Sequence, residues 1–167
     1  QVIEHGDSTF EIAIANPDAT EVMLHISTYS SSISSNAGNA WEFAVNALMY
    51  SEYKHVYVAS PGNGASSRIT GKDALYAATT GRFAREENGI YTPITHLQNL
   101  HAALEKQDLN ATSVMGTDSA GGALAMSFST QLPHDQFNKG IFNAPTGVQK
   151  LGIIGIGNAM LMRERKN

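Results

Sequence analysis

Apolar residues along the chain fall into runs with a period of two or into near-continuous blocks. Residues 9–15 (TFEIAIA) alternate between apolar and polar, which predicts a strand with one face buried. Near-continuous apolar blocks predict strands that are covered on both faces. Four such blocks occur, at residues 21–26, 55–59, 111–115 and 139–143. The chain therefore has the strands of a sheet whose centre is buried.

Helical spacing appears between several of these strands. A helix over residues 40–50 is predicted from four apolar residues at helical spacing, Trp41, Val45, Leu48 and Met49. Thr92-Pro93 opens a second helix. Its stripe consists of Leu97, Leu100, His101 and Leu104. A third helix is predicted over residues 123–131, after a glycine-rich turn at 116–122.

The alternation of strands and helices predicts the fold class. Residues 65–90 are polar and give only short helix-compatible pieces, so they add no clear element. Elsewhere, each buried strand is separated from the next by a crossover long enough for a helix. We therefore expect an α/β fold with a mostly parallel, doubly wound sheet and helices on both faces.

Composition narrows the class of protein. The chain has 167 residues, of which 42% are hydrophobic and 16% charged, so we expect a single domain over residues 1–167. The net charge is -4, and the 11 Lys and Arg residues are scattered apart from a terminal cluster, so no nucleic-acid partner is expected. The absence of cysteine excludes disulfides and thiol nucleophiles. We expect neither a cofactor nor a metal.

The two ends of the chain suggest how far the domain extends. No basic segment followed by an apolar run opens the sequence, so no signal peptide is visible and the compartment stays unknown. The most apolar stretch, residues 151–162, is too short for a transmembrane segment. Because the chain starts at Gln1 and ends just after that stretch, we expect an incomplete domain. Residues 148–167 then begin a lid, a cap or a C-terminal helix.

The segment at residues 114–125 (VMGTDSAGGALA) carries the candidate chemistry. A buried strand runs into a serine flanked by small residues and then into a helix, as in a nucleophile elbow. There the hydroxyl of Ser119 projects above the sheet, and the backbone N–H of Ala120 lies at a helix N-terminus, where it can stabilise an oxyanion. Thr117 and Gly121 lie two positions either side of the serine, and Gly116 is offset by one from the usual glycine. The alternative is that Ser119 only caps the helix.

Two upstream segments resemble parts of the α/β-hydrolase superfamily. Residues 56–67 (VYVASPGNGASS) resemble an apolar strand running into D-x-P-G-x-G-x-S, with Ala59 in place of the Asp. The positions in register are Pro61, Gly62, Gly64 and Ser66. Residues 22–27 resemble a strand ending in His-Gly-x, with His25 matched and Ile26 in place of the glycine. The resemblance makes the backbone N–H of Ser27 the second donor of an oxyanion hole.

The three motifs follow one another in the order of that superfamily, over residues 9–147. The chain is therefore similar to the N-terminal part of an α/β-hydrolase of the serine esterase or lipase type, with its C-terminal strands missing or atypical. The resemblance implies a serine hydrolase that acts on a small-molecule or lipid-like acyl substrate. Ser119 is then the nucleophile, and the N–H groups of Ser27 and Ala120 hold the oxyanion.

The catalytic triad is incomplete in this sequence. In the superfamily the acid and then the histidine follow the nucleophile, but after Ser119 this chain has one histidine, His134, and one Asp, Asp135. Both fall in the loop 133–138, which we expect at the opposite end of the sheet. Four other histidines fall in predicted strands or in a predicted helix, and we expect them to be structural. They are His25, His55, His96 and His101.

Two interpretations of the missing residues remain open. A further chain segment or a protein partner completes the fold and supplies the acid and histidine, or the chain is a catalytically silent hydrolase-like module. The silent module would have a structural or binding role in a larger assembly, for example a virion. A nucleotide-binding domain is a weaker third alternative, because residues 116–122 lack the lysine of a P-loop.

Overall fold

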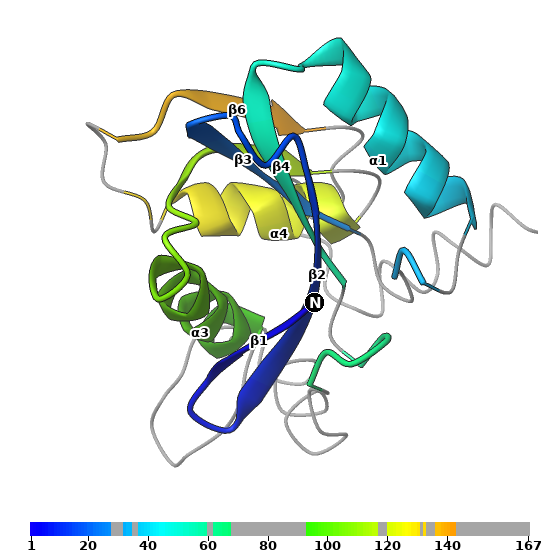
Figure 1. Cartoon of the computed structure of the whole chain (residues 1–167). Coiled ribbons are helices and arrows are strands. Elements are labelled where there is room, and N and C mark those ends of the chain that lie inside the picture. Colours follow the sequence, from blue (N-terminus) through cyan, green and yellow to red (C-terminus); the bar gives the residue numbers. More distant parts are fainter. Residues whose placement is uncertain are drawn as a thin grey trace, which may run out of the picture.

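A six-stranded sheet forms the centre of the molecule (Figure 1). The computed structural model describes residues 1–27, 32–34, 37–59, 62–67, 93–116, 120–130, 132 and 136–142. The strands are β1 (Val2–His5), β2 (Ser8–Ala15), β3 (Glu21–Ile26), β4 (Tyr53–Val58), β5 (Ala111–Gly116) and β6 (Lys139–Phe142). They lie in the order β1-β2-β4-β3-β5-β6. The pairs β4–β3, β3–β5 and β5–β6 are parallel, which confirms the predicted mostly parallel sheet.

The N-terminal strand β1 was not predicted. It forms an antiparallel hairpin with β2, and Gly6 in the connecting turn has a φ of 57°. A two-residue Gly-Asp turn between short extended segments is a known hairpin signal. Ile3 is buried while Val2 is exposed, so β1 contributes a single apolar side chain to the core. One buried residue leaves too little periodicity to mark a strand.

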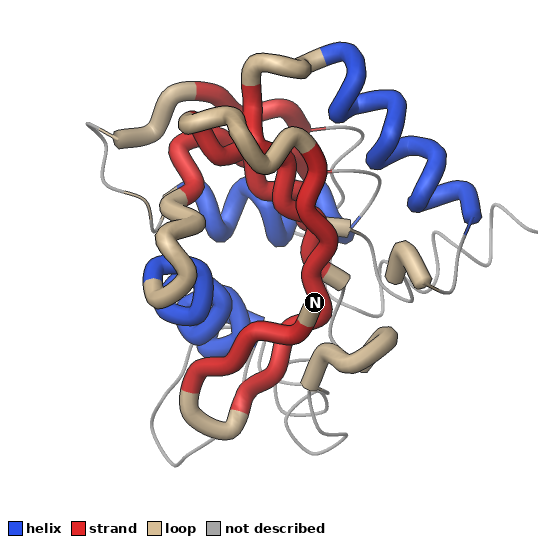
Figure 2. Tube along the Cα trace, viewed as in Figure 1, coloured by secondary structure: helices blue, strands red, loops and turns tan. Residues whose placement is uncertain are grey.

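Helices cover both faces of the sheet, as expected (Figure 2). They are α1 (Ala37–Met49), α3 (Pro93–Glu105) and α4 (Ala120–Ser129). The main apolar core lies between the sheet and the pair α3 and α4, where Leu97, Leu100 and Phe128 pack against Leu24 and Val56. On the other face, Phe43 of α1 packs against Tyr57 and Ala59. None of the helices in the described part of the chain is long and apolar enough to cross a bilayer.

Helix α1 turns a different side to the sheet from the one that its apolar spacing marked. Trp41, Leu48 and Met49 are 73%, 80% and 66% exposed. The residues that α1 buries are Phe43 and Ala47. The sheet presents ring side chains on this face, and the Phe43 ring packs edge-on against Tyr57, with 5.7 Å between ring centroids. The helix is confirmed, but an aromatic contact orients it.

The starts of two helices differ from prediction, and several predicted segments lie outside the described residues. Helix α4 begins at Ala120, so Gly121 and Gly122 belong to its first turn rather than to the preceding loop. Helix α1 begins at Ala37, three residues before the predicted start. Residues 143–167, including the predicted lid or helix at 148–167, are outside the described part of the chain.

Candidate functional site

The strand order creates a point where the chain reverses its direction of travel across the sheet. From β3 the chain moves to β4 on one side, and it then crosses to β5 on the other side of β3. Ile26 at the end of β3 pairs with Val58 of β4 and with Gly116 of β5, so all three strands end at the same level. Ligands of open α/β sheets bind beyond the carboxyl ends of the strands at such a switch point. The predicted oxyanion loop and the predicted elbow both begin here.

The turn from β5 to α4 is very tight. Strand β5 ends at Gly116 and α4 begins at Ala120, which leaves three residues for the reversal. A Cβ atom on Gly116 would lie 2.6 Å from the Cα of Gly122 and 2.8 Å from the Cβ of Ala125. Strand and helix are therefore in contact through their backbones, which a larger residue at position 116 would prevent. Gly116 meets the requirement for a small residue at the strand end, despite its offset from the usual spacing.

The structure describes two of the three predicted catalytic positions. Ala120 is the first residue of α4, so its N–H belongs to the helix end that has no intrahelical acceptor. Ser27 follows β3 directly, is 2% exposed, and donates its hydroxyl to the Val58 carbonyl at 3.3 Å. Ser119 lies outside the described residues, which stop at Gly116 and resume at Ala120. The roles of Ser119, Ser27 and Ala120 stay predictions.

The loop that resembles P-G-x-G-x-S is attached to the ends of β2 and β4. The Ser66 hydroxyl accepts the Glu11 N–H at 2.9 Å and donates to the Ala59 carbonyl at 3.1 Å. The neighbouring Ser67 accepts the Thr9 N–H at 2.7 Å through its hydroxyl. These bonds fix the loop at the same edge of the sheet as Ser27. Pro61 of this motif is outside the described residues.

Glu11 is a site-edge residue that the sequence analysis missed. Its carboxylate accepts the Ala65 N–H at 2.9 Å and the Ser34 hydroxyl at 2.9 Å. It occupies a polar position in an alternating strand, where any solvent-facing residue would give the same pattern. Only the pairing of β2 with β4 brings it to the carboxyl edge, so the sequence held no signal for its position.

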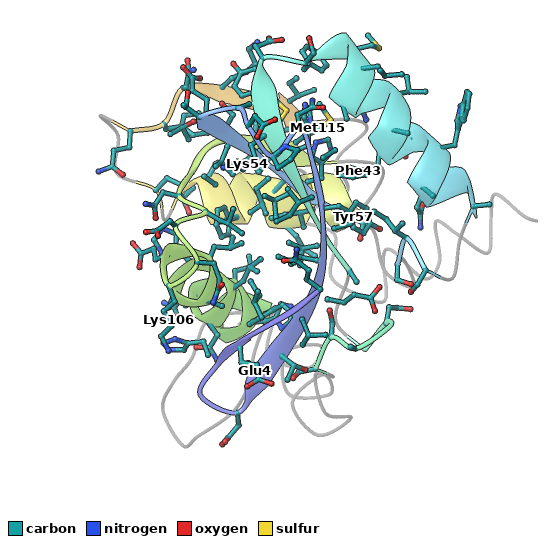
Figure 3. All side chains as sticks on the ribbon, in the orientation of Figure 1. Glu4, Phe43, Lys54, Tyr57, Lys106 and Met115 are labelled. Carbon is teal, nitrogen blue, oxygen red and sulfur yellow. The ribbon has the colours of Figure 1, made fainter. Side chains whose placement is uncertain are left out.

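His25 belongs to a buried pair of histidines. His55 Nε2 donates to the Tyr50 carbonyl at 2.7 Å, so in the uncharged pair His55 Nδ1 accepts a 2.6 Å hydrogen bond from His25 Nε2. The Phe43 ring packs edge-on against His25, with centroids 5.2 Å apart. Phe43 extends from α1 and lies beside Tyr57 of β4 (Figure 3). Burial, with a smaller contribution from His55, lowers the pKa of His25 to about 3. His25 is therefore too weak a base for catalysis at neutral pH, which agrees with the structural role expected for it.

The other described histidines do not suit a general base either. Burial lowers the pKa of His96 to about 4, and its ring packs on Phe10 on the α3 face of the sheet. His101 lies on α3 with its Nδ1 3.6 Å from a Glu105 carboxylate oxygen. His5 lies in β1, with β2 and β4 between it and β3, which places it roughly 14 Å away. His134 and Asp135 lie outside the described residues.

Comparison with known proteins gives matches in structure. No family model matches the sequence, and no curated protein is significantly similar to it. An esterase from Pyrococcus furiosus matches with a TM-score of 0.60 and 12% identity, over 100% of this chain and 55% of that one. The thioesterase domain from the curacin biosynthetic pathway matches with a TM-score of 0.60 and 16% identity, over 97% and 50%. The chain has the α/β-hydrolase fold.

The match covers only part of each α/β-hydrolase. An N-acyl homoserine lactone degrading enzyme matches with a TM-score of 0.52 and 16% identity, over 81% of this chain and 41% of that one. The chain therefore spans about half the length, or less, of these solved structures. At these identities the comparison establishes the α/β-hydrolase fold alone. In this fold, the carboxyl ends of β3 and β5 and the turn into α4 form the candidate active site.

Proposed function

We propose that this α/β-hydrolase is a serine hydrolase that cleaves ester or related acyl substrates with Ser119 as its nucleophile. One observation carries the proposal, and it is the backbone contact between Gly116 and Gly122. A strand and helix in such close contact, joined by three residues, provide the setting in which a serine hydroxyl is directed over the sheet edge. The resemblance of the upstream motifs and the esterase-type structural neighbours support the same reaction class.

The proposed mechanism uses groups at the switch point. The Ser119 hydroxyl loses its proton to a general base while its oxygen attacks the substrate carbonyl carbon. The developing oxyanion accepts hydrogen bonds from the backbone N–H groups of Ser27 and Ala120. The leaving alcohol departs with a proton from the base, and water then hydrolyses the acyl-enzyme in a second cycle of the same steps.

The proposal places the general base and its acid in the part of the fold that the solved neighbours have and this chain does not span. The buried pair His25 and His55 cannot take this role, because its hydrogen bonds fix both rings in the sheet and the low pKa of His25 makes it a weak base. The substrate class is a small-molecule or lipid-like acyl compound. Specificity in this fold depends on loops around the site rather than on the sheet.

Hydrolysis of p-nitrophenyl esters by the full-length protein tests the proposal. Ser119→Ala should lower kcat roughly 10³-fold or more, because the nucleophile is lost while the fold is kept. Ser129→Ala is the matched control and should leave kcat unchanged, since among the described residues that hydroxyl donates to the Met126 carbonyl of its own helix. Equal activity in both variants, or no activity in the folded wild type, would favour the silent-module alternative.

A further inference from the structure

Glu11 lies opposite the end of β4, at the carboxyl edge of the parallel strands. In the antiparallel pair of β2 and β4, Ile12 lies opposite Val58. The next bond in that direction runs from the Ala59 N–H to the Glu11 carbonyl, at 2.9 Å. Because β4 ends level with β3, Glu11 lies at the edge from which Ser27 emerges. A carboxylate is therefore present at the site edge, two strands from β3.

The Glu11 carboxylate joins two segments that are far apart in the sequence. Oε2 accepts the Ala65 N–H, in the loop after β4, at 2.9 Å. Oε1 accepts the Ser34 hydroxyl, in the connection after β3, at 2.9 Å. The Ser34 hydroxyl also lies 3.0 Å from the hydroxyl of Ser32, which is fully buried. One side chain thus bridges the connection that carries Ser27 and the loop that contains Ser66.

The geometry of the loop fits the carboxylate closely. Gly64 has a φ of 54°, which favours glycine, and a Cβ atom there would displace the Glu11 carboxylate, so the loop backbone lies close against this side chain. Ala59 stands where the resembling motif has an Asp, and Glu11 is paired across from Ala59. The neighbouring strand β2 therefore supplies a carboxylate at the end of β4, where Ala59 has none.

Contacts of its described residues anchor the connection after β3 to the end of β4 and to β2. The Ser27 hydroxyl donates to the Val58 carbonyl, and Ile33 packs against the cluster that contains Ala59. The Ser34 hydroxyl donates to the carboxylate of Glu11, which belongs to β2. Oxyanion donors need accurate placement, because a displacement of about 1 Å can cost 10²-fold in rate. Ser34 lies in the same connection as Ser27, whose N–H is the predicted donor.

We propose that Glu11 is a positioning residue, which holds the connection after β3 against the loop 62–67 and thereby fixes the Ser27 N–H for the oxyanion. This inference rests on the proposed hydrolase function. It assigns Glu11 no contact with the substrate and no proton transfer. Its effect should appear in the step in which the oxyanion develops and not in substrate binding.

Steady-state kinetics of the full-length protein separate positioning from general stability. Glu11→Ala should lower kcat about 10-fold with KM changed by less than about 2-fold, since an oxyanion donor acts mainly in the transition state. Glu11→Gln should lie between wild type and Glu11→Ala, because its amide can still accept from Ala65 and donate to Ser34. Glu4→Gln, on the exposed face of β1, is the matched control and should keep wild-type values.

A double-mutant cycle with Ser34 tests the bridge itself. Ser34→Ala should lower kcat, and adding it to Glu11→Ala should cost little more, because both remove the same contact. Additive effects, or a Glu11→Ala kcat equal to that of Glu4→Gln in an enzyme that needs Ser119, would overturn the positioning role. A fall in thermal stability with unchanged kcat would also overturn it.

Hydrogen exchange separates this inference from the proposed function. The Ala65 amide should exchange at least about 10-fold faster in Glu11→Ala than in Glu4→Gln, because its acceptor is gone. Equal exchange rates would overturn the bridge whether or not the protein is an enzyme. If wild type shows no Ser119-dependent turnover but exchange differs as expected, the hydrolase proposal fails and the contact of Glu11 stands.

Discussion

Gly116 and Gly122 lie so close that one added carbon would overlap the helix backbone. A Cβ atom on Gly116 would be 2.6 Å from the Cα of Gly122 and 3.0 Å from the Gly121 carbonyl oxygen. Backbone atoms cannot rotate away as a side-chain end can, so α4 would have to move. The spacing between strand and helix at the proposed nucleophile is therefore set by the absence of a side chain at position 116.

Gly116→Ala should destabilise the protein by about 2 kcal/mol, the usual cost of overpacking a tight contact. It should also lower kcat by more than 10-fold at temperatures where the variant is fully folded, because α4 carries the Ala120 N–H and follows Ser119. Urea unfolding and ester hydrolysis measure the two effects.

A substitution in the same strand provides the control for Gly116→Ala. The Ser113 hydroxyl is fully buried and has no hydrogen-bond partner among the described residues. Ser113→Ala removes an unsatisfied polar group, so it should leave stability equal or slightly higher. If Gly116→Ala proved as stable and as active as Ser113→Ala, the tight contact between β5 and α4 would be wrong.

Two buried histidines should make stability fall in mild acid. In the folded protein burial holds the pKa of His25 near 3 and that of His96 near 4, below the ordinary value of 6.5. The unfolded chain therefore binds protons first as the pH falls. The free energy of unfolding therefore has its full contribution from the two uncharged histidines above about pH 6.5. This contribution is lost progressively toward pH 3, by up to about 1.4 kcal/mol per pH unit for each histidine.

Urea unfolding between pH 6 and pH 5 measures this dependence before most carboxylates titrate. The free energy of unfolding should drop by up to about 3 kcal/mol over that unit, with both histidines contributing. His96→Gln should reduce the slope by about half, whatever it does to stability at pH 7. A wild-type stability that is flat over this range would show that neither histidine is buried as described.

Trp41 gives a direct test of the orientation of α1. It is the single tryptophan of the chain and is 73% exposed, on the same helix as Leu48 at 80%. Native fluorescence should therefore resemble that of the unfolded protein in its emission maximum, and iodide should quench it freely. Trp41→Ala should change the free energy of unfolding by less than about 0.5 kcal/mol. A blue-shifted native emission protected from iodide would mean that this face of α1 is covered.

Sequence patterns were sufficient to predict the elements whose buried residues recur regularly along the sequence. Strand β3 was predicted to the residue, because its consecutive residues Val22 to Ile26 are all buried and form a near-continuous apolar block. The helix α3 was predicted from Leu97, Leu100 and Leu104, which are all almost fully buried. Each of these residues packs in the core, and the helical spacing of the local sequence is enough to predict that.

The features missed by the sequence analysis arise from contacts between distant segments. The face that α1 buries depends on Phe43 meeting Tyr57, residues that come together only in the folded sheet. Glu11 reaches Ala65 across 54 residues of sequence. The tight β5–α4 turn was predicted from its glycines, but the contact of Gly116 with Gly122 depends on the start of α4 at Ala120. Spacing alone did not give that start.

Reaction of the folded, full-length protein with a fluorophosphonate probe tests the central claim most directly. Such probes bond only to a serine whose hydroxyl is activated and accessible. The peptide that carries the adduct is identified by mass spectrometry. We predict one adduct, on Ser119, that is absent in Ser119→Ala and retained in Ser129→Ala. A folded protein that takes up no probe, or carries it on another serine, would contradict the account.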